Sequence, residues 1–508
     1  MISAIGGITF LTHPLLAGAT LAVTYAFILV IKALLHPLRN VPGPFWGRFT
    51  RLWYLRAVTK GDFEKQNINL HRTHGSIVRI APGQYSLDDP EAIRTIYSHS
   101  SPFLKAPWYL ASGRSNAEVC DLFTDLDPRR HSINRRKVAS LYSMTSLVQM
   151  ESCVVDCTAL LEQQLSKLAS LGQSFDLQQW MQFYAFDVIG LITVNKRFGF
   201  LDSGIDENAL IESLHTFLLY AANVGIFAEW HPILSRILAL FPSSGMRHLV
   251  AFAERQIGQG QEKLEAKGSY AQSSASFLEK LLGMHYQSQG KISMADLFTT
   301  CITNIGAGSD STSISLTAIL YNIFKHPTVY EKLREEIDQA HAQGLVSARA
   351  ITFRESQSLL YLQACIKEGM RMFPATGLPL ARVVPKGGAT LCGRVFPEGE
   401  IVGVNTWVIH RNRSVFGEDA DSFRPERWLE ESPERVLEME RNFLAFGAGA
   451  RTCIGKNISL MEISKLIPDL IRRFDFELVD MAAPLKTQNV WFVKQLDIKC
   501  RVRFRQMV

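Results

Sequence analysis

The sequence predicts a mainly α-helical fold with small β-sheets (α+β), preceded by one transmembrane helix at the N-terminus. Three observations predict this architecture. Helical periodicity dominates the chain after its first 46 residues, strand-like runs are short, and no Asp, Glu, Lys or Arg occurs from Ile2 to Ile31. The 508 residues are 47% hydrophobic and 20% charged, an ordinary globular composition that excludes fibrous, low-complexity and mostly disordered proteins.

Charge and cysteine content narrow the class further. The 54 Lys and Arg against 48 Asp and Glu leave a net charge of +6, spread too evenly for a nucleic-acid-binding protein. Such a charge suits an anionic membrane or an acidic partner. Eight cysteines are sparse for this length, so we expect the fold to be held by its core rather than by disulfides.

The uncharged N-terminal segment is long enough to cross a bilayer, which takes about 20 helical residues. A secretory signal peptide is the alternative, but the segment has no basic start, is too long and ends without a small-residue cleavage site. Lys32 and Arg39 follow it, which places the body on the cytosolic face. We therefore divide the chain into an anchor (1–36), a proline-rich hinge (37–46) and one large domain (47–508).

Amphipathic helices and short strands follow in order along this domain. No repeat of 20–50 residues is present, so a solenoid or propeller is excluded. A loop is expected over 266–274. The predicted helices cover 61–73, 90–98, 133–145, 150–167, 180–196, 207–222, 247–266, 294–325, 328–340 and 356–372, and the predicted strands cover 76–80, 390–392, 401–404 and 497–502.

The longest predicted helix has polar and glycine residues at its middle. Ser293 and Asp296 form a capping-box pattern and Pro327 forces an end, giving about 32 residues and about 48 Å of helix. Gly306 to Thr312 reads Gly-Ala-Gly-Ser-Asp-Ser-Thr. One interpretation is a kinked helix with a solvated polar spot. The other is a helix whose backbone a ligand can approach, with an acid and hydroxyls aimed at that ligand.

A cysteine stands in a glycine-rich loop near the C-terminus. Phe446 to Gly455 reads Phe-Gly-Ala-Gly-Ala-Arg-Thr-Cys-Ile-Gly, and a helix is expected from Lys456 to about Phe474, with Pro468 kinking it or ending it early. Cys453 thus precedes a helix N-terminus, which favours a thiolate that can ligate a metal. A single local cysteine suits neither zinc nor an iron–sulfur cluster, and a dinucleotide loop lacks its third glycine.

This loop resembles the haem-binding signature of the cytochrome P-450 haem-thiolate enzymes at every defining position. Three further segments resemble motifs of the same family in the same order, and the resemblance extends over essentially the whole chain. They are Ala307 to Thr312, similar to the oxygen-activating motif of the central helix, Glu368 to Arg371, similar to Glu-x-x-Arg, and Phe423 to Trp428, similar to the Arg-bearing loop. The resemblance implies a cytochrome P-450 fold, with residues 47–508 as the haem-thiolate catalytic domain.

The resemblance also implies roles for individual residues. Cys453 is the expected axial ligand of the haem iron. Asp310 is expected to supply protons toward dioxygen, with Ser311 and Thr312 as neighbouring hydroxyls. The family usually has Thr at the position of Ser311, so the sequence leaves open whether Ser311 or Thr312 is the main hydroxyl.

The haem propionates need cationic partners. Candidates are His131 and Arg135, four residues apart on one helix face, together with Arg382 and Arg451; His131 stands where the family usually has Trp. Phe446 and Gly447 complete the cofactor-binding prediction. The neighbouring basic residues form either a solvated helix face or a surface for an acidic flavin reductase; they are Arg129, Arg130, Arg136 and Lys137.

Glu368, Arg371 and Arg427 are expected to form a buried network that braces the loop under the haem. We interpret these residues as structural rather than catalytic. Removing one of them leaves a buried charge uncompensated, at a cost of about 3–5 kcal/mol.

Residues 74–83, 103–109 and 122–127 resemble the fungal branch of the family typified by pisatin demethylase. That branch implies a lipophilic small-molecule substrate, in secondary metabolism or detoxification, and hydroxylation or O-demethylation. The candidate pocket residues are Trp108, Tyr109, Ile305, Ala307, Thr376, Gly377, Leu378, Val490, Trp491 and Phe492.

The preferred hypothesis is a monooxygenase anchored by a single pass in the endoplasmic reticulum membrane, with its catalytic domain cytosolic. It carries haem b and takes electrons from NADPH through a flavin-bearing NADPH-cytochrome reductase. The alternative is a haem-thiolate isomerase or dehydratase that needs neither O2 nor reductase; a non-catalytic haem-binding role is a third. Asp310 with its adjacent hydroxyls favours the first, since the others need no proton supply.

Overall fold

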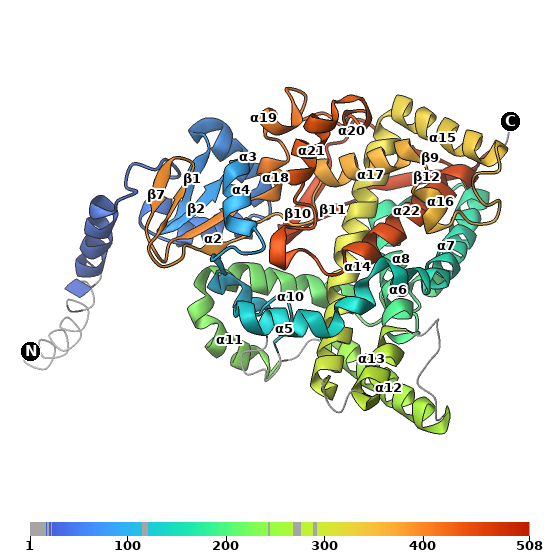
Figure 1. Ribbon diagram of the computed structural model, residues 1–508, viewed down its shortest axis with the longest axis horizontal. Coiled ribbons are helices and arrows are strands. Elements are labelled where there is room, and N and C mark those ends of the chain that lie inside the picture. Colours follow the sequence, from blue (N-terminus) through green and yellow to red (C-terminus); the bar gives the residue numbers. More distant parts are fainter. Residues whose placement is uncertain are drawn as a thin grey trace, which may run out of the picture.

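The computed structural model describes residues 17, 20–21, 23–113, 120–241, 244–267, 276–287 and 292–506. Within these ranges the protein is mainly helical with small sheets, as predicted. Figure 1 shows the helices gathered around a long central helix, with the largest sheet at the end of the body next to the N-terminus. The predicted loop over 266–274 lies largely outside the described residues, as do residues 1–16 of the predicted anchor.

Nine of the ten predicted helices are observed with ends displaced by at most four residues. The helix predicted over 133–145 is wrong, because the chain there has a helix that ends at Val138, then a 3₁₀ turn, and a short helix that begins at Met144. The α-helices of the body follow in chain order. They are α2 (Leu52–Thr59), α3 (Phe63–His74), α4 (Pro90–Tyr97), α5 (Pro128–Val138), α6 (Met144–Val148), α7 (Glu151–Leu171), α8 (Leu177–Val194), α9 (Phe200–Ser203), α10 (Leu210–Val224), α11 (His231–Leu238), α12 (Ser244–Lys267), α13 (Phe277–Gln287), α14 (Met294–Lys325), α15 (Pro327–Ala342), α16 (Phe353–Ser356), α17 (Leu360–Met372), α18 (Thr406–Ile409), α19 (Arg413–Phe416), α20 (Arg427–Glu430), α21 (Pro433–Arg441) and α22 (Lys456–Arg473), with 3₁₀ turns η1 (Trp46–Arg48), η2 (Pro107–Ser112), η3 (Ala139–Tyr142), η4 (Gly225–Trp230) and η5 (Gly449–Arg451).

The strands form four small sheets. The largest has the order β1-β2-β8-β5-β3, in which only β2 and β8 run parallel. Its strands are β1 (Ile77–Ala81), β2 (Gln84–Leu87), β3 (Leu104–Lys105), β5 (Arg382–Val383) and β8 (Ile401–Val404). A second sheet has the order β4-β12-β9, with β4 (Ser174–Asp176), β12 (Lys499–Phe504) and β9 (Phe474–Leu478). The other two sheets are hairpins. One pairs β6 (Ala389–Leu391) with β7 (Arg394–Phe396), and the other pairs β10 (Lys486–Val490) with β11 (Phe492–Leu496).

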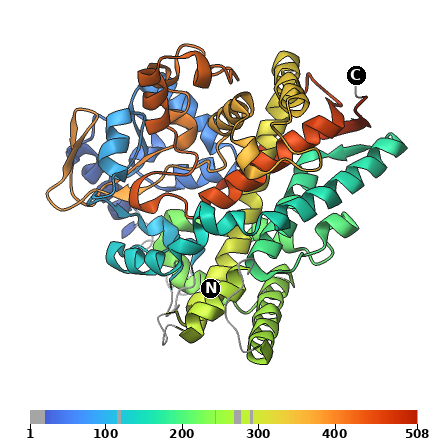
Figure 2. The ribbon, with the colours of Figure 1, turned by 45° about the vertical axis from the view of Figure 1, so that its right-hand side comes forward.

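Helix α14 runs through the middle of the helical body, and its ends are those the sequence predicts. The Ser293 side chain accepts from the Asp296 N–H while the Asp296 carboxylate accepts from the Ser293 N–H, a complete capping box. The helix stops at His326, before a proline that cannot continue it. Figure 2 shows α14 in yellow running the height of the body, with α22 in red crossing it. This placement lets both helices contribute to one central cavity.

Helix α22 differs from the prediction. Pro468 was expected to kink this helix or end it early, yet α22 continues for five more residues to Arg473, so the early end was wrong. Proline removes one backbone hydrogen bond, a cost that the surrounding packing can outweigh. Leu466, Ile467 and Leu470 around it are buried in the core. Tertiary packing therefore holds the helix through its proline.

The described part of the predicted anchor is an apolar helix over Val23–Leu35 that projects away from the body (Figure 1). Its side chains are open to the surroundings: Phe27 is 64% exposed and Leu35 is 74% exposed. By length and composition alone, one described helical stretch could cross a membrane, Leu210–Leu238. That stretch joins α10, η4 and α11, and Ala222 and Ile226 within it are buried in the domain.

Candidate active site

A cavity of about 310 Å³ lies at the centre of the domain, bounded by α5, α14, the glycine-rich loop before α22, and the turn at Trp491 and Phe492. Cys453, Phe446 and Gly447 line it, as does the middle of α14. The structure therefore brings the cysteine loop and the polar centre of the longest helix to one enclosed space.

The loop that presents Cys453 depends on its glycines. Gly447 and Gly449 have φ angles of 67° and 61°, which favour glycine, and a Cβ on Gly449 would lie 1.7 Å from the carbonyl oxygen of Tyr97. The Cys453 N–H donates to the Phe446 carbonyl at 2.8 Å and closes the loop. The Cys453 side chain is exposed, and it lines the cavity. The glycines thus form the turn that orients the Cys453 thiol toward the cavity.

The thiol needs a positive partner to be a thiolate. Burial raises the pKa of Cys453 above its ordinary value, although the N–H groups of Gly455 and Lys456 and the charge of Arg135 act in the opposite direction. A bound metal ion deprotonates a coordinating thiol outright. Among the described residues, no group of three or more His, Cys, Asp or Glu is arranged to hold a metal, so Cys453 is suited to a metal whose other ligands come from a cofactor.

Helix α14 presents one face to the cavity. Ala307, Ser311 and Ser315, each four residues apart, line it together with Gly308. The Ser311 hydroxyl donates to the Ala307 carbonyl at 2.7 Å. Because Ala307 and Gly308 carry little or no side chain, a ligand can lie close to the helix backbone here. The helix is continuous, so this arrangement fits the ligand-approach interpretation of the sequence.

Asp310 and Thr312 do not line the cavity. Both are buried on other faces of α14: the Thr312 hydroxyl bonds the Ser459 hydroxyl at 2.8 Å, and the Asp310 carboxylate accepts from Gln182 Nε2 at 2.5 Å. Of the three predicted catalytic residues, Ser311 alone reaches the cavity. This geometry favours Ser311 over Thr312 as the main hydroxyl.

A polar group not predicted from the sequence surrounds Asp310. Lys494 of β11 donates to Gln182 Oε1 at 2.7 Å, and Gln182 of α8 in turn donates to Asp310. Burial raises the pKa of Asp310, while the charges of Lys494 and His215 and the Gln182 hydrogen bond act against that rise. Neither Gln182 nor Lys494 stands in a recognisable motif. A pairing between α8 and β11 depends on long-range packing that the local sequence does not encode.

The predicted propionate ligands do converge. His131, Arg135, Arg382 and Arg451 all line the cavity. Arg382 Nη1 donates to the Tyr109 hydroxyl at 3.2 Å. Burial, together with the nearby charges of Arg451 and Lys105, lowers the pKa of His131 to about 4, so it is neutral at pH 7. A neutral imidazole is suited to donate an N–H, like the Trp that the family usually has at this position.

Lys105 is a basic residue that the sequence reasoning missed. It is 7% exposed, lines the cavity, and lies 4.2 Å from the centroid of the Tyr109 ring. Burial and the charges of Arg382 and Arg451 hold its pKa well below the ordinary value. No local pattern marks this lysine, because only the pairing of β3 with β5 brings it beside Arg382.

The basic groups of the cavity are not balanced by acids. Within the part of the chain that the structure describes, no Asp or Glu forms an ion pair with Arg135, Arg382 or Arg451. The two carboxylates that line the cavity are engaged elsewhere, Asp121 with Thr124 and Asp296 with Ser293 and Lys137. Buried and half-buried cations without a counter-charge are costly, so a dianionic ligand such as haem fits these three arginines.

The predicted pocket residues divide among three places. Tyr109, Ala307, Thr376, Trp491 and Phe492 line the central cavity. Trp108 and Leu378 line a second cavity. The remaining three, Ile305, Gly377 and Val490, line neither cavity. The helical and strand periods turn Ile305 and Val490 into the core.

Behind the cysteine loop lies the predicted ion network. The Glu368 carboxylate, fully buried, accepts from Arg371 Nε and Nη2, both at 2.8 Å, and from Arg427 Nε at 2.9 Å. Trp428 Nε1 donates to the same carboxylate at 3.0 Å. The prediction of a buried three-member network is confirmed. None of its members lines the cavity, which is consistent with a structural rather than a catalytic role.

Comparisons with known proteins agree with this geometry. The cytochrome P-450 family model matches residues 41–499. The chain is 40% identical over 460 residues to a pisatin demethylase of Fusarium vanettenii, covering 90% of this chain and 87% of that protein. It is 36% identical over 484 residues to the cytochrome P-450 monooxygenase gsfF of Penicillium aethiopicum, covering 93% and 94%. It is 34% identical over 494 residues to the monooxygenase pkfB of Emericella nidulans, covering 96% and 95%.

Proposed function

The chain belongs to the cytochrome P-450 family of haem-containing monooxygenases, and we propose that it inserts one oxygen atom of O2 into a lipophilic small molecule. The reaction we assign is hydroxylation or O-demethylation, in fungal secondary metabolism or detoxification. The observation that carries the proposal is the meeting of the exposed Cys453 thiol, the unbalanced arginines and the Ser311 face of α14 around one cavity.

Each part of the cavity has a distinct task. Cys453 holds the haem iron, and Arg135, Arg382 and Arg451 take the propionates, aided by His131 and by Phe446 and Gly447 of the loop. When bound, the haem supplies oxygen activation at an iron whose thiolate ligand favours O–O cleavage.

Proton supply is the task of α14. The Ser311 hydroxyl lines the cavity and donates its proton to the Ala307 carbonyl, whereas the carboxyl of the neighbouring Asp310 lies on another face of the helix. Asp310 is not exposed to the cavity, so we assign it to a route from the opposite side, where Lys494 reaches Gln182. A buried carboxyl whose pKa is raised is suited to accept and return a proton.

The substrate class follows from the lining. Tyr109, Phe123, Ile189, Trp491 and Phe492 present apolar and aromatic surface to the cavity, with the polar groups concentrated near the cysteine and on α14. Such a site takes an apolar molecule and orients it with few hydrogen bonds. The similarity to a relative named pisatin demethylase supports a substrate that carries a methyl group.

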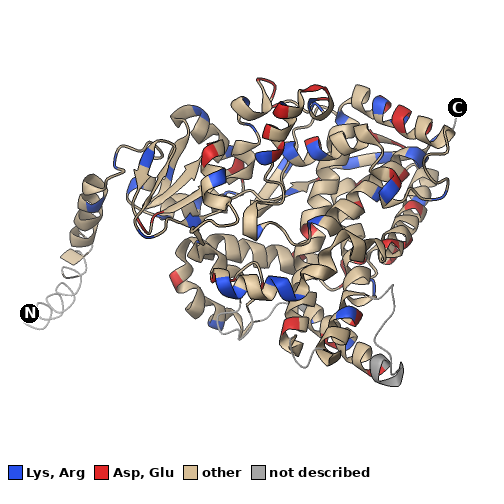
Figure 3. Cartoon of the chain, in the orientation of Figure 1, with Lys and Arg blue, Asp and Glu red and all other residues tan. Residues whose placement is uncertain are grey.

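Electrons are assigned to NADPH through a flavin-bearing reductase that docks on α5. Arg129, Arg130 and Arg136 are exposed there, and Figure 3 shows Lys and Arg gathered on this helix. A basic face suits an acidic partner and speeds its association. The apolar helix over Val23–Leu35 supports a single-pass anchor in the endoplasmic reticulum membrane with a cytosolic catalytic domain.

Isotope labelling tests this function. The full chain in lipid nanodiscs, with a fungal reductase and NADPH, is supplied with lipophilic aromatic methyl ethers under 18O2. Hydroxylation incorporates one 18O atom into the product, and O-demethylation releases formaldehyde, in both cases only with NADPH and O2 present. Conversion without O2 or reductase would instead identify an isomerase or dehydratase.

A further inference from the structure

The buried ion network of Glu368 and its two arginines shares no hydrogen bond with the Cys453 loop (residues 444–455) in the part of the chain that the structure describes. The side-chain hydrogen bonds of its three members all end within residues 368–372 and 410–428. Any effect of the network on Cys453 is therefore transmitted by a further residue.

His410, which follows α18 directly, joins the network to the loop. Its Nδ1 lies 3.0 Å from the Arg371 carbonyl oxygen, and its Nε2 accepts from the Leu444 N–H at 2.8 Å. In the opposite direction, Arg371 Nη1 donates to the His410 carbonyl at 2.6 Å. Among the described residues, no other side chain from outside the Cys453 loop bonds to the backbone of that loop.

The two partners of the ring fix where its proton lies. A carbonyl oxygen only accepts, so the proton is on Nδ1, and a backbone N–H only donates, so Nε2 is unprotonated. Burial and the charge of Arg371 lower the pKa of His410 to about 3, and the ring is therefore neutral at pH 7. His410 and Arg371 are fully buried and Leu444 is 2% exposed, so losing either bond leaves a buried polar group unsatisfied.

Ring stacking holds the residue before Leu444 as well. The His410 and Phe443 rings are parallel to within 4°, with centroids 5.2 Å apart. The Phe443 ring also meets Trp428 edge-on at 5.8 Å, and Trp428 Nε1 donates to Glu368. One polar and one aromatic contact therefore fix the start of the Cys453 loop to the network.

Two backbone hydrogen bonds connect this start with the cysteine. The Gly447 N–H donates to the Leu444 carbonyl at 2.9 Å, and the Cys453 N–H donates to the Phe446 carbonyl at 2.8 Å. Leu444, Phe446 and Gly447 line the cavity beside Cys453. A shift of Leu444 therefore moves the turn that orients the thiol.

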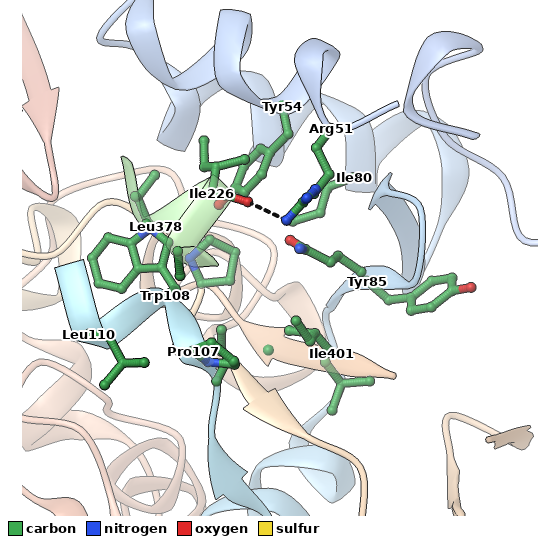
Figure 4. A pocket seen from close by; sticks show the side chains of 18 of the residues that line it. Arg51, Tyr54, Ile80, Tyr85, Pro107, Trp108, Leu110, Ile226, Leu378 and Ile401 are labelled. Atoms are coloured by element: carbon green, nitrogen blue, oxygen red, sulfur yellow. Dashed lines mark hydrogen bonds between the residues drawn. The ribbon is translucent and has the colours of Figure 1, made fainter. Parts of the chain in front are cut away.

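His410 itself does not contact a ligand space. It lines neither the Cys453 cavity nor the second cavity, whose lining includes Tyr54 and Trp108 (Figure 4). A substitution at His410 therefore leaves the lining residues of both cavities unchanged and acts on the haem iron through the loop.

We propose that His410 is a positioning residue that couples the buried ion network to the Cys453 loop and so keeps Cys453 bound to the haem iron as a thiolate. The proposal rests on the proposed function, because it takes Cys453 to be the iron ligand. The hold of His410 on Leu444 is measured independently of that function.

Amide variants separate the two ring nitrogens. His410→Gln places its amide as many bonds from the backbone as Nε2, so it still accepts from the Leu444 N–H but loses the bond to Arg371. His410→Asn places its amide at the distance of Nδ1, so it still donates to the Arg371 carbonyl but does not reach Leu444. Each variant loses one hydrogen bond, so a purely structural role predicts equal behaviour, whereas the proposal predicts that only His410→Asn releases the loop.

Hydrogen–deuterium exchange of the Leu444 amide measures release of the loop. The holoenzyme, as the full chain in lipid nanodiscs, is exchanged and read by mass spectrometry with residue-resolved fragmentation. Exchange at Leu444 should be about tenfold faster in His410→Asn and near the wild-type rate in His410→Gln. His410→Phe, which keeps the stacked ring and loses both hydrogen bonds, is a second variant that should release the loop.

The spectrum of the reduced, carbon-monoxide-bound protein measures the thiolate. During incubation without denaturant at one fixed temperature, the red-shifted Soret band should convert to an unshifted band. This conversion should be about tenfold faster in His410→Asn and His410→Phe than in wild type or His410→Gln.

The matched control is His71→Asn, at another buried histidine. His71 is 6% exposed, lines neither cavity, and bonds through its two ring nitrogens to the Gly75 carbonyl and the Ser86 hydroxyl, both at 2.8 Å. The variant should lose stability without changing the exchange at Leu444 or the rate of the spectral conversion.

Equal behaviour of His410→Gln and His410→Asn in either measurement would overturn the proposal, as would a His71→Asn variant that matches His410→Asn. A wild type without a red-shifted band would instead contradict the proposed function, whatever the exchange at Leu444. A wild type with that band and the expected ranking of the variants in both measurements supports the proposal.

Discussion

Two carboxylates are buried in the same helical core with opposite surroundings. Glu368 of α17 is enclosed by fixed donors: two arginines, an indole N–H and the Arg424 backbone N–H all reach its oxygens. Burial alone raises a carboxyl pKa, but the hydrogen bonds and charges of Arg371 and Arg427 outweigh it, and the pKa of Glu368 is below its ordinary value. Glu368 is held as an anion.

Asp310 of α14 has far less support. Its carboxylate accepts one side-chain hydrogen bond, from Gln182, and among the described residues no cation pairs with it directly. Burial dominates here and raises its pKa. The contrast teaches that burial by itself does not assign a role. A carboxylate whose partners are rigid cations braces the fold, whereas one with a single neutral donor can change its protonation during a reaction.

The largest expected effect is a loss of stability on substitution of Glu368. Glu368→Gln leaves Arg371 buried without a counter-charge and leaves Arg427 with Asp419 alone, so it should lower the free energy of unfolding by about 3–5 kcal/mol. Denaturant unfolding measures the loss. The matched control is Glu440→Gln, which breaks the exposed Lys367–Glu440 pair and should cost less than about 1 kcal/mol. Equal losses in the two variants would contradict the brace.

The second effect is on turnover, at the other carboxylate. Asp310→Asn removes a proton-exchanging group and should lower product formation about 100-fold, a typical loss for one acid–base group. Its raised pKa means that the ionised form costs stability above the ordinary carboxyl pKa, so the neutral amide should not destabilise the fold at pH 7. Turnover and denaturant unfolding measured on one preparation separate the effect on catalysis from the effect on stability. If Asp310→Asn lost as much stability as Glu368→Gln, the distinction between a catalytic and a structural carboxylate would be contradicted.

The third prediction compares the neighbouring hydroxyls of Ser311 and Thr312, of which only that of Ser311 lines the cavity. Ser311→Ala removes a hydroxyl from the cavity and should raise the fraction of NADPH consumed without product by several-fold, an effect smaller than that of Asp310. Thr312→Val keeps the shape and loses only the bond to Ser459, so coupling should stay near the wild-type value. Parallel assays of NADPH and product give the ratio. The opposite ranking would return the role to Thr312.

The smallest effect concerns pH. The groups that face Asp310 are Gln182 from α8, His215 from α10 and Lys494 from β11. Lys494→Met removes a positive charge that favours the ionised carboxylate, so the pKa of Asp310 rises further. In a plot of the rate of product formation against pH, the change in rate that follows the titration of Asp310 should therefore move to higher pH. Lys486→Met, on the exposed side of the same hairpin, should leave the pH profile unchanged. A limb that moves to lower pH would contradict the assignment.

The sequence predicted those features that depend on neighbouring residues. Helix α14 was predicted to the residue because its capping box and its terminal proline are local signals. The Cys453 loop was predicted because its closely spaced glycines, which permit a tight turn, are visible in the sequence. The paired positions of Glu368 and Arg371, three apart on one helix, were visible for the same reason.

Features that depend on distant pairing were missed or misjudged. Lys105 joins the arginines only because β3 pairs with β5, and Lys494 reaches Gln182 across 312 positions of sequence. The side of α14 to which Asp310 turns depends on which neighbours pack there. Pro468 misled because packing around α22 outweighs the lost hydrogen bond. Local sequence signals thus identified candidate functional residues, whereas their contacts depend on long-range packing.

The central claim is that Cys453 ligates haem iron as a thiolate, and the spectrum of the reduced, carbon-monoxide-bound protein tests it most directly. The wild type should show a strongly red-shifted Soret band, and Cys453→Ser should lose that shift while Cys365→Ser, at a buried cysteine away from the cavity, keeps it. An unshifted band in well-folded wild type, or a shifted band that survives in Cys453→Ser, would contradict the account.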